Sequence, residues 1–139
     1  RCIDFYTEIL SGRLGNTYYK LMYELAMTKV LYIVMSGKEA EEKFDLALIS
    51  ATRMLENSMV EKVKLLFFGP SEILLAHASG ERAQKIKKLI GMGAVDSACS
   101  GVAKEINVEA ELKILGVNLE RYSSRLVALL NEGYTPITF

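Results

Sequence analysis

Among the residues of this chain that could do covalent chemistry, Cys99 has the most informative position. It lies in the stretch GAVDSACSGVAKE (residues 93–105), after a short segment that predicts a strand and before one that predicts a helix. If the helix begins near Ser100, the backbone N–H groups of Ser100, Gly101 and Val102 point toward the sulfur. The positive end of the helix dipole then favours a thiolate, which makes Cys99 a candidate catalytic nucleophile.

The same pattern also fits a purely structural cysteine. Cys99, Val102, Ala103 and Ile106 recur at helical spacing and form an apolar stripe. Free cysteine is among the residues most often buried in protein cores. From the residues alone, both roles for Cys99 stay open.

His77 is the only histidine and a possible auxiliary base for Cys99. A lone histidine in a segment such as LLAHAS more often lies on a helix surface or at a helix end. The chain has no C-x-x-C spacing, and its second cysteine, Cys2, is far away in the sequence, so we expect no metal site. Phosphate-binding loops and the dinucleotide fingerprint are also absent, and we expect no cofactor.

Alternating strand and helix patterns position these residues. Residues 29–35, 62–68, 94–98 and 134–139 predict strands, and Pro136 indicates a sheet edge or a strand end for the last one. Residues 38–57, 80–93 and 118–133 predict helices, with shorter helices at 71–77, 99–106 and 108–116 and Ser71 as a possible cap. This alternation predicts an α/β fold with a mainly parallel sheet.

In such sheets, ligands gather at the carboxyl ends of the strands. We therefore expect a pocket around Cys99 that several strand-end residues shape. These residues are Ser36, Gly37, Gly69, Pro70, Ser100 and Gly101.

Composition limits the possible functions further. The 139 residues fit one main domain, at 29–139, preceded by an N-terminal extension at 1–28 in which NTYYKLMYELAM predicts a helix. Lys plus Arg equals Asp plus Glu at 17 each, so we expect no direct nucleic-acid binding and a tendency to self-associate. No apolar run reaches the ~18 residues of a membrane span. The sparse cysteines suit a reducing, cytoplasmic compartment.

Four segments in order resemble the DsrE/DsrF-like family over roughly residues 29–139. They are KVLYIVMSGKEAEEKFDLALISATRMLE, VKLLFFGPSEILLA, GAVDSACSGVAKEINVEAELKILGVNLE and LVALLNEGYTPITF. The resemblance implies a three-layer α/β/α sandwich with about five strands, flavodoxin-like or DsrEFH-like. It also implies a homo-oligomer, a trimer or a hexamer.

By the same resemblance, Cys99 is the candidate persulfide carrier of a small sulfur-relay protein. Its partners would then be sulfur donor and acceptor proteins. The alternative is a non-catalytic oligomeric module that binds a small anion or nucleotide at the strand ends. A third interpretation, an assembly scaffold, rests on the N-terminal aromatic helix and the zero net charge.

Overall fold

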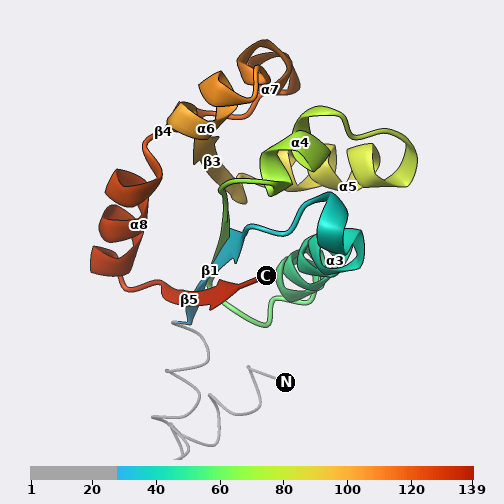
Figure 1. Ribbon diagram of the computed structural model, residues 1–139. Coiled ribbons are helices and arrows are strands. Elements are labelled where there is room, and N and C mark those ends of the chain that lie inside the picture. Colours follow the sequence, from blue (N-terminus) through green and yellow to red (C-terminus); the bar gives the residue numbers. More distant parts are fainter. Residues whose placement is uncertain (1–27) are drawn as a thin grey trace, which may run out of the picture.

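A five-stranded parallel sheet forms the centre of the protein. The computed structural model describes residues 28–139, so the predicted N-terminal helix lies outside the described residues. The strands pair in the order β4-β3-β2-β1-β5 (Figure 1). Their bounds are β1 Lys29–Val34, β2 Lys62–Phe67, β3 Val95–Cys99, β4 Leu119–Glu120 and β5 Thr135–Thr138. The order differs from the 2-1-3-4-5 of flavodoxin, because β1 lies between β2 and β5 here, whereas the first strand of flavodoxin lies between the second and the third.

Helices cover both faces of this sheet, which confirms the three-layer α/β/α architecture. On one face lie α3 (Glu41–Glu56), α4 (Ser71–Ala76) and α5 (Gly80–Gly91), and on the other lies α8 (Tyr122–Asn131), as Figure 1 shows. The remaining elements are η1 (Lys38–Ala40), α6 (Ser100–Glu105) and α7 (Glu109–Leu115). No helix within residues 28–139 has the length and apolar composition needed to cross a membrane.

The central strand β1 supplies side chains to two separate cores. Val30, Tyr32 and Val34 belong to the larger core beneath α3 and α5, while Leu31 and Ile33 belong to the smaller core beneath α8. A parallel strand covered on both faces is expected to be apolar throughout, which is why KVLYIVM reads as one continuous run.

The segment 118–133 departs from the prediction of a single helix. Leu119 and Glu120 form β4, and the helix begins only at Tyr122. Parallel pairing of Leu119 with Ala98 and of Glu120 with Cys99 satisfies backbone groups that a helix would otherwise have used. By spacing alone, Leu119 and Leu130 share one face of a helix with Tyr122, Leu126 and Leu129, but Leu119 lies in β4 and Leu130 is exposed.

Strand β3 contains an irregularity next to the cysteine. Leu65 pairs with Val95 and Leu66 pairs with Ser97, so Asp96 is an extra residue without a partner on β2. Side chains alternate along a strand, and the inserted residue therefore moves Ser97 and Cys99 to the face that α8 covers. In a regular register Cys99 would face the opposite core.

Candidate functional site

A pocket of about 540 Å³ lies at the carboxyl end of β3 and β4, between α6 and the start of α8. Cys99, Ser100 and Gly101 line it, as the sequence predicts. The other lining residues are Phe68, Lys104, Glu109, Arg121, Tyr122, Ser123 and Ser124. The volume lies within the range of roughly 300–1,000 Å³ that small-molecule sites occupy.

Cys99 stands at the junction between strand and helix, in the pocket wall. It is the last residue of β3 and the N-cap of α6. The residue is 8% exposed, so it is largely buried, and it is among the residues that line the pocket. An ideal Cβ on Gly101 would lie 3.9 Å from the Cys99 Sγ atom, which leaves the space beside the sulfur free of a side chain.

An aromatic pair forms another wall of the pocket. The rings of Phe68 and Tyr122 stack with centroids 4.0 Å apart and planes 9° from parallel. Burial raises the pKa of the Tyr122 hydroxyl, so it stays neutral and can donate a hydrogen bond at physiological pH. Sequence reasoning missed both residues. The sequence held one signal for each: Phe68 directly follows a strand, and Tyr122 begins a helix, and both positions can line a pocket at the carboxyl edge of a sheet.

Three charged side chains line the pocket. Lys104 comes from α6, Arg121 precedes α8, and Glu109 begins α7. Within residues 28–139 neither Lys104 nor Arg121 forms an ion pair or a side-chain hydrogen bond. The grouping of these charges could not be predicted from the sequence, because each lies on a different element. Their closeness in space depends on how α6, α7 and α8 meet.

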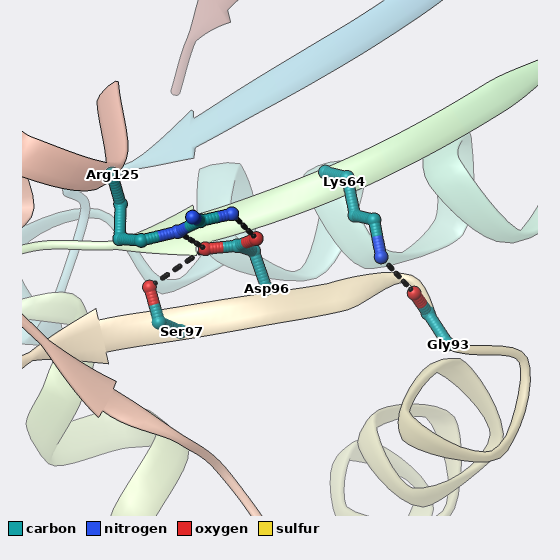
Figure 2. Close-up of polar contacts among 5 residues, drawn as sticks. All are labelled: Lys64, Gly93, Asp96, Ser97 and Arg125. Atoms are coloured by element: carbon teal, nitrogen blue, oxygen red, sulfur yellow. Dashed lines mark hydrogen bonds and ion pairs between the residues drawn. The ribbon is translucent and has the colours of Figure 1, made fainter. Parts of the chain in front are cut away.

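A partly buried ion pair holds α8 against the sheet below this pocket. The guanidinium of Arg125 donates two hydrogen bonds to the Asp96 carboxylate, at 3.0 and 2.7 Å, and the Ser97 hydroxyl donates a third at 2.9 Å (Figure 2). Burial alone would raise the pKa of Asp96, but the hydrogen bonds from Arg125 and Ser97 outweigh it and lower that pKa. Nearby, the Lys64 ammonium donates to the Gly93 carbonyl at 2.7 Å.

Contrary to expectation, Ser36, Gly37, Gly69 and Pro70 do not line this pocket. An ideal Cβ on Gly37 would lie 2.6 Å from both the Cβ and the carbonyl oxygen of Pro70, so the two loops touch. Ser36 is buried, and its N–H donates to the Phe139 carbonyl at 3.2 Å. The loops after β1 and β2 therefore contact each other, and the loop after β1 also contacts the end of the chain.

The short helix α4 extends this closed region. The Ser71 hydroxyl does not cap the helix as predicted but donates to the Val34 carbonyl of β1 at 2.5 Å. His77 follows α4, is exposed, and does not line the pocket, so the structure offers no contact through which it could assist Cys99.

Glu72 is a buried carboxyl group in the same helix. Its Oε2 accepts a hydrogen bond from the Gly69 N–H at 3.1 Å, while its Oε1 has no partner among the described residues. Burial raises the pKa of Glu72 to about 7, and the Gly69 hydrogen bond opposes this only in part. Sequence reasoning overlooked Glu72 because an acid in the first helical turn usually lies in solvent.

No three His, Cys, Asp or Glu side chains within residues 28–139 are arranged to hold a metal ion. The pocket brings together a thiol, two cations, the carboxylate of Glu109, hydroxyl groups and an aromatic wall.

Comparison with known proteins supports the architecture. No family model and no curated protein sequence matches the chain. Two solved structures do, both of proteins of unknown function. The one from Bacteroides thetaiotaomicron has a TM-score of 0.68 at 17% identity over 80% of this chain and 94% of its own. The one from Methanobacterium thermoautotrophicum has a TM-score of 0.60 at 22% identity over 81% of this chain and 99% of its own. At these identities, the likeness establishes the fold that this chain shares with them.

Proposed function

We propose that this protein is a sulfur carrier in which Cys99 accepts a sulfane sulfur and passes it to a partner thiol. The observation that carries the proposal is the position of Cys99, the only cysteine within residues 28–139, in the wall of the pocket. The resemblance of residues 29–139 to the DsrE/DsrF-like family independently points to the same residue.

The transfer needs a nucleophile and a leaving group but no redox partner. The Cys99 thiolate attacks the outer sulfur of a persulfide R–S–SH. A new S–S bond forms at Cys99, the S–S bond of the donor breaks, and the donor leaves as R–S⁻ with the electron pair. A partner thiolate then attacks the outer sulfur on Cys99 in the same way, and Cys99 returns to its starting state.

Space beside the sulfur is needed for the added atom. Gly101 provides it, because no side chain projects from that position toward the Cys99 Sγ. The hydroxyl group of Ser100 and the cations Lys104 and Arg121 line the same pocket and can stabilise a terminal persulfide anion.

The experiment is intact-mass analysis after brief incubation with inorganic polysulfide. We expect the gain of one sulfur atom, located at Cys99 by peptide mapping, and loss of that gain in Cys99→Ser. Cys2→Ser serves as the control and should load normally. Loading that persists unchanged in Cys99→Ser would overturn the proposal.

Several further expectations belong to this proposal. A homo-oligomer, as a trimer or hexamer, is tested by light scattering during size-exclusion chromatography.

A non-catalytic module for small anions is the alternative function, which the two cations of the pocket favour. That alternative predicts that Cys99→Ser retains anion binding while no sulfur is ever transferred.

A further inference from the structure

We propose that the pocket selects small anionic sulfur compounds, with Arg121 and Lys104 pairing with a carboxylate on the donor while Cys99 attacks its outer sulfur. This selectivity rests on the proposed function, because it names the class of sulfur donor that reacts with the same Cys99. The preference of the pocket for anions can be tested apart from sulfur transfer.

The charge of the pocket walls favours an anionic ligand. Arg121 and Lys104 line the pocket without an ion-pair partner among residues 28–139, whereas two other arginines are held in ion pairs. Arg82 is bonded to Asp45 and Arg125 to Asp96. Glu109 is the one acidic residue in the lining, so positive charge exceeds negative there although the chain as a whole is neutral. An excess of one sign in a concave site raises the local concentration of oppositely charged ligands.

The walls of the pocket present different surfaces to a ligand. The stacked rings of Phe68 and Tyr122 form an apolar wall, and the two cations form a subsite that binds an anion. Cys99 is the reactive point in the same cavity of about 540 Å³. A compound with a short carbon chain, a carboxylate and a terminal persulfide presents one group to each of these surfaces. Arginine suits the carboxylate particularly well, because its planar fork can donate two hydrogen bonds.

The chemical step is unchanged by this selection. The carboxylate remains ionised and paired throughout, and it takes no part in bond making. The donor S–S bond breaks as the Cys99 S–S bond forms, and the carboxylate-bearing thiolate leaves. Anchoring the donor at a second point orients its outer sulfur toward the nucleophile.

The test compares two thiol reagents of similar shape and opposite charge on the full chain carrying Cys2→Ser. These are the sulfonatoethyl and the trimethylammonioethyl methanethiosulfonates, which both transfer their thioalkyl group to Cys99 and release methanesulfinate. The rate constant for modification of Cys99 by each reagent is divided by the rate constant for the reaction of that reagent with 2-mercaptoethanol, which removes the difference in intrinsic reactivity. We expect the anionic reagent to be favoured about threefold to tenfold, and about 1 M salt to remove most of the preference.

Matched variants assign the preference to the pocket. Arg121→Gln and Lys104→Gln should each lower the ratio of the normalised rate of the anionic reagent to that of the cationic reagent, while Glu109→Gln should raise this ratio. Arg53→Gln, at an exposed arginine of α3 on the other side of the sheet, should leave it unchanged. A normalised ratio at or below one, or an equal effect of Arg121→Gln and Arg53→Gln, would overturn the inference.

A second measurement separates this inference from the proposed function. Persulfides of 3-mercaptopropionate and of cysteamine are compared as sulfur donors to Cys99. Equal loading from both would refute the anionic substrate class and leave the sulfur carrier intact. Loading from neither, with the reagent preference preserved, would refute the sulfur carrier and leave the anion selectivity of the pocket.

Discussion

The carboxyl edge of the sheet has two halves that differ sharply. After β1 and β2, the loops at Gly37 and Pro70 are packed so tightly that a single Cβ would collide. After β3 and β4, the chain leaves a pocket of about 540 Å³ beside Cys99. Both halves are the carboxyl ends of parallel strands, and both are rich in small residues. The carboxyl end of a strand therefore opens into a pocket only where the loops that follow the strands stay apart.

The comparison is tested most strongly by adding one methyl group in each half. Gly37→Ala places a Cβ 2.6 Å from the Pro70 backbone oxygen, and the backbone must move to relieve it. We expect the free energy of unfolding to fall by about 1–3 kcal/mol, as for other overpacked sites. Urea denaturation followed by circular dichroism measures it. A stability equal to that of the unsubstituted protein would show that the closed half is not tightly packed.

The open half depends on the ion pair that anchors α8. Arg125→Met keeps the length of the side chain but leaves the Asp96 carboxylate, whose side chain is 7% exposed, with only the Ser97 hydroxyl. We expect a loss of about 1–2 kcal/mol at pH 7, reduced from the full cost of an unpaired buried charge because Arg125 is partly exposed.

The pH dependence gives this second prediction a clear sign. In the parent protein the pKa of Asp96 is lowered below its ordinary 3.8. The ionised carboxylate therefore stabilises the fold at neutral pH, and this stabilisation is lost as the pH falls through the lowered pKa. The variant should therefore differ from the parent most at pH 7, and progressively less as the pH falls below the ordinary pKa of 3.8. A difference that is constant with pH would contradict the assignment to Asp96.

Glu72 provides a test within the closed half. Its pKa of about 7 exceeds the ordinary 4.5, so the folded state holds a proton that the unfolded chain releases, and stability falls as the pH rises from about 4.5 to 7. Glu72→Gln removes this loss, and we expect it to be more stable than the parent by about 1 kcal/mol at pH 8 and not at pH 5. Urea titrations at the two pH values provide the measurement, and equal differences at both would argue against a buried titrating carboxyl.

The smallest effect on stability is expected in the open half itself. Gly101→Ala brings a Cβ only to 3.9 Å from the Cys99 Sγ, an ordinary contact, and should change the unfolding free energy by no more than about 0.5 kcal/mol. The same methyl group narrows the space beside the sulfur, so alkylation of Cys99 by iodoacetamide should slow a few-fold. Unchanged alkylation would mean that reagents approach the sulfur from another side.

Most of the fold could be predicted from the sequence because it depends on local patterns. The apolar run of β1 and the stripe of Phe44, Ala47, Leu48 and Ala51 in α3 are visible in the residues and are buried in the structure. Strand β4 was missed because two residues carry too little pattern to compete with the helical spacing that follows. Its existence depends on pairing with β3, which is a long-range contact.

The site was predictable only in part for a similar reason. Cys99, Ser100 and Gly101 are neighbours in the sequence and line the pocket together. Arg121 and Tyr122 lie far along the chain, and they reach the pocket because α8 crosses to the opposite face of the sheet. The expected pocket residues Gly37 and Pro70 are instead in contact with each other, which no local rule indicates.

By itself, the sequence determined that the chain builds a parallel α/β sandwich and that its one distinctive thiol stands between a strand and a helix. Hydrophobic periodicity and strand-end position suffice for both, since they depend on residues close together in the chain. The tertiary structure decided which face Cys99 occupies, through the extra residue at Asp96, and which strand ends stay open. Those outcomes depend on register and on loop-to-loop packing, which arise only when distant segments meet.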